Sequence, residues 1–443
     1  MRLKLLQILM MGCFAIGCGS VTSHYRQVED YYEAGRFKNA DQIIESNREG
    51  YGDLNAVLYY MDKGMTTHLA GEFKKSNEYL TLAEDTIELL YRKSMARGLG
   101  SMLTNDNIYP YEGEDFEKVM LNIMMALNYI YLNQPDEALV EARKVDHKLN
   151  LLNDKYEEKN VYQDDVLARY LSGILYEMRG EINDALIEYR KAYEISQIYH
   201  KNYGTPILPY LNKDLLRTTE ALHFDEEFKK YQSEFSGTQW PSSESLRLKG
   251  ELIVLVFNGR APIKEDYFID AVIPEGKEWE GEIVRVAFPK FVARHPKANY
   301  YNIHFGDKIN DCQTYLIEDI AAIAQKNLAD RITRISTKAT ARAITKYIAG
   351  RKLRQEAAKS GNPLVSNLTW LGTNIYSVAS EQSDKRSWRT LPGQIQIGRV
   401  ILEPGEYHIV ITPMCANTPA GQERFFDAVI KAEDKKFIIV YNY

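Results

Sequence analysis

The chain has few cysteines, few histidines and no long apolar run beyond its first residues. Its 443 residues include 4 Cys, 8 His and 4 Trp. The histidines show no HxxxH or HExxH spacing, and no P-loop, GxGxxG or GxSxG motif occurs. No later stretch reaches the roughly 18 apolar residues of a membrane-spanning helix. We therefore predict no metal site, no cofactor, no catalytic residues, no small-molecule substrate and no transmembrane helix.

The chain also lacks a strong charge of either sign. There are 55 Lys and Arg residues against 61 Asp and Glu, which gives a formal net charge of −6. A mildly acidic protein has no overall field that would attract nucleic acid, so nucleic acid is not a predicted partner. The hydrophobic share of 45% is ordinary for globular protein, and the length fits two domains.

What the first residues do have is the pattern of an export leader. Two basic residues precede the apolar stretch Leu5–Gly17, which is too short to span a bilayer of about 30 Å. The stretch ends in Ala15-Ile16-Gly17-Cys18, which resembles the lipobox of bacterial lipoproteins. This resemblance implies a signal peptide at 1–17, acyl chains such as palmitate on Cys18, and an anchored segment at 18–23. A conventional secretory signal cut nearby is the alternative.

The residues after the lipobox indicate a compartment. Cys18 is followed by Gly19 and Ser20, without the Asp that would suggest retention at the inner membrane. By resemblance to these sorting rules, we expect the outer membrane, with the protein facing the periplasm. That compartment is oxidising, so Cys312 and Cys415 could form one disulfide. Two unpaired buried thiols are equally compatible with the sequence.

The segment 24–235 contains a repeated pattern typical of tetratricopeptide (TPR) repeats, in which small residues recur where two antiparallel helices touch. Four copies share the same internal offsets, and they contain Gly35…Ala40…Ile44, Gly64…Gly71…Ser76…Leu80…Ala83, Ala126…Tyr129…Ala138…Ala142 and Gly173…Tyr176…Gly180…Ala185…Tyr189…Ala192. The unequal spacing of the copies predicts insertions near 94–115 and 151–163. We expect an all-α, TPR-like solenoid, with helices around 215–222 and 226–235 capping it.

The repeat offsets also identify the residues that should line the concave groove of the solenoid. These are Met61, Met65, His68, Met120, Ile123, Leu127, Ile130, Tyr170 and Ile174. The set is mostly apolar, and an exposed apolar groove of this size would be a liability. We therefore predict that the groove holds an apolar helix or strand. It could come from a partner protein or from this chain's own 200–240 segment.

The second half, 247–443, has the pattern of an α+β domain. Strands are predicted within 251–304, helices within 317–380 and further strands within 394–442. This order fits a β-sandwich-like core that is interrupted by a long helical insertion.

The long helix carries a basic ladder at four-residue intervals, consisting of Arg334, Lys338, Arg342 and Lys346. The ladder could bind anionic lipid headgroups, a glycan or an acidic partner. It could equally be a solvated helix face that pairs with carboxylates of its own domain. Trp388, between Arg386 and Arg389, has the same two interpretations, namely a binding anchor or a packed core residue.

Segments of both halves resemble a family of bacterial TPR-containing lipoproteins, some of which are encoded near a lipoprotein activator of penicillin-binding proteins. The segments that carry the resemblance are 105–117, 126–129, 138–143, 250–252, 261–264, 342–347 and 384–392. The resemblance implies a periplasm-facing scaffold that binds envelope proteins, with a role in envelope or peptidoglycan maintenance, and it supplies no catalytic residues. The alternative function is binding or processing of an envelope polysaccharide or peptidoglycan by the second half.

Overall fold

The computed structural model describes residues 24–97, 109–154, 162–276, 279, 281–306, 311–359, 362–367, 369 and 383–443. The predicted leader and Cys18 lie outside the described residues, as do large parts of both predicted insertions. Within the described ranges, none of the helices combines the length and the apolar character that crossing a bilayer requires.

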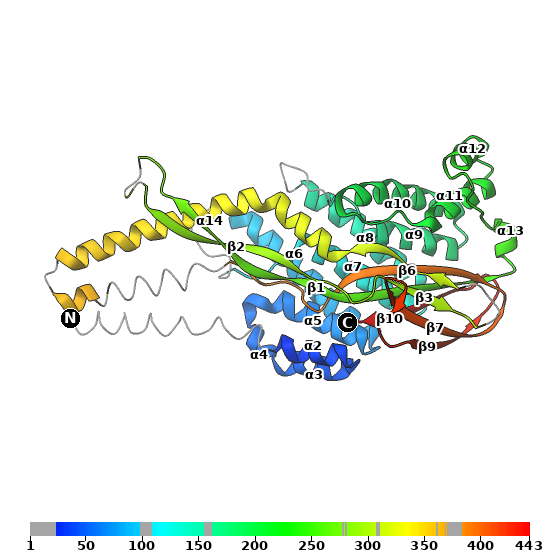
Figure 1. The fold of residues 1–443 in the computed structure, drawn as a ribbon, viewed down its shortest axis with the longest axis horizontal. Helices are drawn as coiled ribbons and strands as arrows, with labels where there is room; N and C mark the ends of the chain where they lie inside the picture. The colour runs from blue at the N-terminus through cyan, green and yellow to red at the C-terminus, as the bar shows by residue number, and fades with distance from the viewer. Residues whose placement is uncertain are drawn as a thin grey trace.

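The first half consists of antiparallel helix pairs that stack side by side (Figure 1). The pairs are α2 (Tyr25–Glu33) with α3 (Phe37–Ser46), α5 (Ala56–Leu69) with α6 (Phe73–Arg97), α7 (Asp115–Tyr131) with α8 (Pro135–Asp154), α9 (Val166–Met178) with α10 (Ile182–Tyr203), and α11 (Pro209–Ala221) with α12 (Asp225–Glu234). Three short helices join or follow them: α4 (Arg48–Tyr51), the 3-10 helix η2 (Asp53–Asn55) and α13 (Ser243–Leu246). The predicted helical region of TPR-like pairs is therefore present.

The small residues of the repeat pattern lie where the two helices of a pair touch. A Cβ atom added to Gly64 would lie 2.3 Å from Leu80 Cδ2, and one added to Gly173 would lie 2.4 Å from Tyr189 Cε1. Contacts that short do not occur, so each pair can close only around glycine. The sequence offsets thus reflect direct steric contact between helices.

The second half contains two five-stranded sheets. The first has the order β10-β1-β6-β5, with β2 paired to the outer half of β1, and the second has the order β4-β3-β7-β8, with β9 paired to β7. The strands are β1 (Gly250–Val272), β2 (Ile283–Arg294), β3 (Tyr300–His304), β4 (Cys312–Gln313), β5 (Tyr315–Asp319), β6 (Pro392–Leu402), β7 (Gly405–Cys415), β8 (Thr418–Pro419), β9 (Arg424–Ile430) and β10 (Lys435–Asn442). All pairs are antiparallel except β1 with β10, which is parallel.

The two sheets pack face to face, as the predicted sandwich requires. Alternate side chains of β1, such as Leu252 and Val254, enter the core between the sheets together with Ile303 and Ile411. The intervening side chains of β1 face the helices instead. Burial on both faces explains why residues 252–257 are continuously apolar rather than alternating.

The predicted helical insertion is α14 (Ile320–Lys359), but it begins three residues later than expected. Residues 317–319 belong to strand β5, which pairs with β6. Ile317 is fully buried, because it packs into the core shared with the helices. Tertiary pairing therefore overrides the helical periodicity at this end.

The outer half of helix α14 and the outer half of the β1–β2 hairpin together project from the body. We call this projection the arm (residues 265–273, 282–290 and 339–359). Ala339 and Ala343 of α14 pack on Val284, Val286 and other apolar residues of the hairpin. The arm extends past the helical array to one side of the molecule (Figure 1).

Candidate functional site

The concave groove of the helices is filled by this chain's own first sheet. The predicted groove residues are all buried except Ile130, which is partly buried. They share one core cluster with the helix-facing side chains of the sheet, which are Ile253, Leu255, Phe257, Ile395, Ile397, Phe437 and Ile439. The predicted groove residues therefore lie against an apolar sheet, and strands of this chain occupy the groove.

The sequence left two sources open for the occupant of the groove, a partner protein or the 200–240 segment, and the strands come from neither, because they belong to the second half of this chain. Most of this segment forms α11 and α12, the last helix pair of the array, which extends the groove instead of filling it. The pair α11–α12 buries its apolar faces by stacking on the preceding helix pair. A strand that fills the groove, by contrast, must also bury its other face against a second layer. The strands of the second half meet that need.

His68 shows how closely the two halves fit. Its ring stacks on Phe257 at a centroid distance of 5.8 Å, and its Nε2 lies 3.1 Å from the Tyr441 hydroxyl. Its Nδ1 lies 2.6 Å from Asn128 Oδ1. Burial lowers the pKa of His68 to about 4, so the ring is neutral at physiological pH. His68, which was predicted to line the groove, thus connects the helices to the first sheet of the same chain.

A buried ionic network joins the last repeats to the sheet. Its members, three of each sign, are Arg217, Arg399, Lys435, Glu177, Asp214 and Glu251. The Arg399 guanidinium, 5% exposed, lies 2.6 Å from both Asp214 and Glu251. Sequence reasoning missed this network, although a lone Glu177 at the concave face of an apolar groove was the signal available.

A second buried cluster joins α7 to the base of the arm. Glu114 pairs with Lys264 and Arg331, and these two cations hold its pKa well below the usual value despite burial. Glu117 accepts hydrogen bonds from the backbone N–H of Glu114 at 2.9 Å and of Trp388 at 2.7 Å. Burial and then the charge of Glu114 raise the pKa of Glu117 to about 7. Three of the segments that carry the family resemblance, 105–117, 261–264 and 384–392, thus meet at one seam.

Trp388 and its neighbours belong to this seam and not to an exposed anchor. Trp388 is 1% exposed. Arg386 pairs with Asp384 at 2.6 Å and donates to the backbone carbonyl of Tyr109 at 3.0 Å. The interpretation of Trp388 as a packed core residue is therefore the one that the structure supports.

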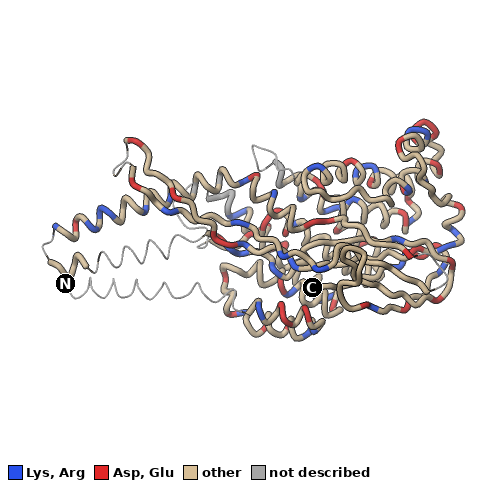
Figure 2. The backbone as a smooth tube through the Cα atoms, in the orientation of Figure 1, with Lys and Arg blue, Asp and Glu red and all other residues tan. Residues whose placement is uncertain are grey.

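The basic ladder is not a continuous exposed stripe. Arg342 is 4% exposed and lies beside Ala343, which packs on the hairpin. Lys346 is half-buried, and the side chains of Arg334 and Lys338 lie outside the described part of the structure. The four-residue spacing places the residues on neighbouring turns, but of the two ladder side chains that the structure describes, Arg342 is buried and Lys346 is half-buried. Figure 2 shows that other Lys and Arg residues follow the outer part of α14.

Cys312 and Cys415 are free thiols. Cys312 pairs with Ile303, which pairs with Ile411, and Cys415 is four residues further along β7. Strand spacing and rise place the two Cα atoms about 15 Å apart. A disulfide cannot bridge more than about 7 Å, so the two thiols are unpaired, as in the second alternative, but both are half-buried instead of buried.

One carboxyl group of the second half has tyrosine neighbours, as a polysaccharide-processing enzyme would need. Glu318 lies near Asp165 and Tyr199, and its Oε2 has no hydrogen-bond partner in the described structure. Burial, and then Asp165, raise the pKa of Glu318 well above its usual value. Glu318 is only 1% exposed, so in this conformation it lies beneath the surface and does not face a cleft.

The arm carries a concentration of exposed apolar side chains. Val272 is 60% exposed and its strand partner Ile283 is 63% exposed. Phe268 lies on the same face of the hairpin, and Leu353 is 59% exposed on the outer part of α14. Contiguous exposed apolar surface usually marks an interaction site.

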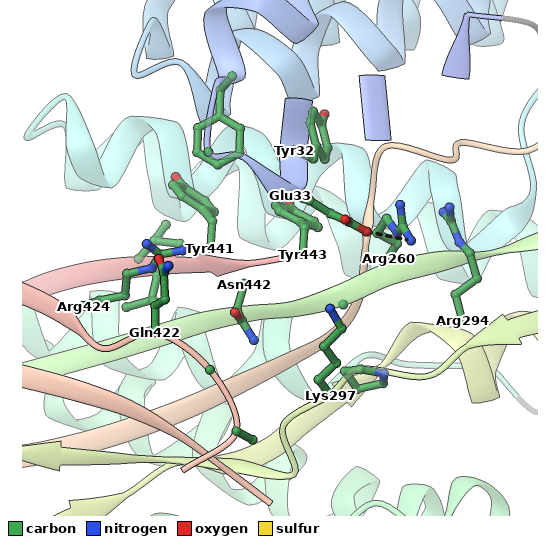
Figure 3. Close-up of a pocket in the computed structure, with 18 of the residues that line it drawn as sticks. Tyr32, Glu33, Arg260, Arg294, Lys297, Gln422, Arg424, Tyr441, Asn442 and Tyr443 are labelled. Carbon is green, nitrogen blue, oxygen red and sulfur yellow. Dashed lines mark ion pairs between the residues drawn. The ribbon is translucent and has the colours of Figure 1, made fainter. Parts of the chain in front are cut away.

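The described structure also has a cavity where the first helix pair meets one end of the sandwich (Figure 3). Its volume is about 740 Å³. It is lined by the α2–α3 turn, the end of β2 with residues 295–297, the segment 420–426 and the last residues of β10. Among its side chains, the lining includes four Lys or Arg residues but one carboxylate, Glu33, and it also includes Tyr443, the last residue of the sequence. A pocket of this size and polarity can hold a small ligand.

No protein-family model matches the chain, and no curated protein sequence matches it. Solved structures of TPR proteins match about half of the chain. TPR-like repeats from Podosopora anserina are 13% identical and cover 48% of this chain and 92% of their own, with a TM-score of 0.31. MamA is 14% identical over 50% of this chain and 98% of its own, with a TM-score of 0.31. A thermophilic TPR protein of Thermus thermophilus is 14% identical over 48% of this chain and 88% of its own, with a TM-score of 0.23.

Proposed function

We propose that this chain is a lipid-anchored scaffold of the outer membrane, facing the periplasm, that binds an envelope protein through its arm. The observation that carries the proposal is the exposed apolar surface of the arm at Phe268, Val272 and Ile283. The helical groove, the usual peptide site of such repeats, is occupied by the chain's own sheet. A partner must therefore bind elsewhere.

The anchor and the arm are compatible in position. Tyr25, the first residue of α2, follows Cys18 by seven residues, which span at most about 25 Å when extended. On the same helix, Glu29 pairs with Arg294 at the base of the β1–β2 hairpin, at 2.5 Å. A lipid on Cys18 would thus hold the base of the arm close to the membrane.

The anchor is tested by Cys18→Ser, compared with wild type by fractionation of the cell envelope. We expect the variant to leave the membrane fraction or to keep its leader, because no other membrane attachment is predicted. A mature Cys18→Ser protein that stays in the outer-membrane fraction would contradict the proposed anchor.

The arm is tested by Ile283→Asp, with a photo-crosslinking residue at position 270 in both the variant and the wild type. We expect crosslinks to an envelope protein in cells for the wild type and their loss in the variant, while the melting temperature stays within about 2 °C because Ile283 is exposed. The matched control is Leu248→Asp, which is 72% exposed and lies before β1, at the far end from the hairpin tip. Equal crosslinking by Ile283→Asp and wild type would remove the arm from the proposal.

A further inference from the structure

The cavity between the first helix pair and the sandwich has an unbalanced charge. Arg260 lies 3.3 Å from both Glu29 and Glu33, and Arg294 lies 2.5 Å from Glu29. These two cations are therefore neutralised by carboxylates of α2. Lys297 and Arg424 are exposed and form no ion pair with any residue in the described ranges. Two cations of the lining thus have no ion-pair partner among the described residues.

The cations lie around a common space. Figure 3 shows Arg260 and Lys297 on one side of the cavity and Arg424 on the other. Arg294 lines the same cavity and is paired with Glu29. Burial is the main cause that lowers the pKa of Arg294 to about 10, whereas Glu29 raises this pKa and Arg260 and Arg389 lower it by smaller amounts. A negative group in this space would be attracted from both sides.

The inner wall of the cavity is aromatic. The rings of Phe37 and Tyr443 lie 6.4 Å apart and those of Phe37 and Tyr441 lie 5.5 Å apart, each in an edge-to-face arrangement. All three residues are only partly buried, so the wall keeps ring surface for a ligand. The Tyr443 hydroxyl is buried and has no hydrogen-bond partner in the described structure. An aromatic wall below a cationic rim suits a ligand with a flat or apolar part and an anionic group.

We propose that this cavity binds a small anionic ligand, whose carboxylate or phosphate lies between Lys297 and Arg424 and whose ring or apolar part lies against Phe37, Tyr441 and Tyr443. This site is separate from the arm and does not depend on the scaffold proposal. The cavity volume of about 740 Å³ suits a molecule larger than a free inorganic anion.

Calorimetric titration of the whole mature protein tests this site with three probes of similar size: phenyl phosphate, phenylacetate and neutral benzyl alcohol. We expect at least one anion to bind with a Kd of about 1 mM, as is usual for so small a probe. Benzyl alcohol should bind at least tenfold more weakly. Preference for phenyl phosphate assigns the site to phosphorylated ligands, and preference for phenylacetate assigns it to carboxylates. Inorganic phosphate should bind more weakly than phenyl phosphate, because it lacks the ring.

The double variant Lys297→Gln/Arg424→Gln should weaken binding of the preferred anion at least tenfold and leave the melting temperature unchanged, since neither side chain forms an ion pair within the described residues. The matched control is Lys431→Gln/Lys436→Gln, which removes the same charge at the other end of β10 from two exposed lysines. It should bind like wild type. The site is overturned if benzyl alcohol binds as well as the anions, if none of the probes binds at 10 mM, or if the two double variants bind equally.

Discussion

At the scale of single residues, Arg399 connects elements far apart in sequence. Its guanidinium forms ion pairs with Asp214 of α11 and Glu251 of β1. The guanidinium carbon also lies 5.4 Å from the centroid of the Tyr170 ring. Burying these charges separately would cost several kcal/mol, whereas burying them together satisfies each one. The network therefore favours one position of the first sheet relative to the helices.

Arg399→Met should lower the free energy of unfolding by about 3–5 kcal/mol, because Asp214 and Glu251 would then lose a buried counter-charge. Urea unfolding followed by circular dichroism measures the loss. The control is Arg179→Met, whose ion pair with Asp136 is exposed and should contribute little. Equal losses in the two variants would mean that the buried network does not stabilise the seam.

Glu117 should make the stability depend on pH. Its pKa is raised from 4.5 to about 7 in the folded state, so the folded protein holds a proton that the unfolded chain releases between these values. The proton's contribution to stability is complete below pH 4.5 and is lost as the pH rises to about 7. Glu117→Gln cannot ionise. Between pH 4.5 and 8, wild type should lose up to about 3 kcal/mol more stability than Glu117→Gln.

Urea unfolding of wild type and Glu117→Gln at pH 4.5, 6 and 8 measures this difference. Comparing the two proteins at each pH cancels the titration of the other groups, including the oppositely shifted Glu114. If both proteins show the same change of stability with pH, the proposed protonation of Glu117 is incorrect.

At the scale of elements, the apolar groove of the helices and the apolar face of the first sheet bury each other. The repeats bring Leu127 and similar apolar side chains to one concave surface, and β1 has apolar side chains on both faces. Neither element is stable in water with these surfaces uncovered. Packing the strand face into the groove buries both surfaces at once.

Leu127→Asp should therefore destabilise the isolated protein by several kcal/mol, because it places a carboxylate in a core shared by α7 and the first sheet. Thermal and urea unfolding of the purified protein measure the loss. Val140→Asp on α8, where the side chain is 55% exposed, is the control and should stay close to wild type. Wild-type stability in Leu127→Asp would show that the groove is open in solution.

At the scale of the whole molecule, the two predicted domains form one body with a shared core. The main core cluster runs from the helix pairs through the groove into the first sheet. Ion pairs at both ends of the seam, at Arg399 and at Glu114, hold the sheet in place. A division of the chain near residue 246 would cut through this core.

Residues 24–246 and 247–443, expressed separately, should each expose apolar surface, bind a hydrophobic dye such as ANS and melt without cooperativity. Expressed together, they should form a 1:1 complex that melts cooperatively, since the shared core can then form. Analytical ultracentrifugation and calorimetry measure both properties. Two halves that each melt cooperatively and do not associate would contradict the shared core.

The sequence alone determined the local structure of this protein. The offsets around Gly64 and Gly173 predicted the helix pairs because a glycine is required by direct contact within one repeat. The apolar run 252–257 predicted a buried strand, and the strand–helix–strand order predicted the sandwich with α14 inserted. Such patterns are visible because the contacts that select them lie close together in the chain or repeat at a fixed period.

Tertiary structure alone decided which surfaces remain free. The groove was filled by β1, β6 and β10 instead of by residues 200–240, because only a sheet that is apolar on both faces could cover it. The same packing buried Arg342, which interrupts the basic ladder, and left the arm and the cationic cavity exposed. These outcomes depend on contacts across more than a hundred residues, for which a sequence pattern gives the surfaces that need covering but not the segment that covers them.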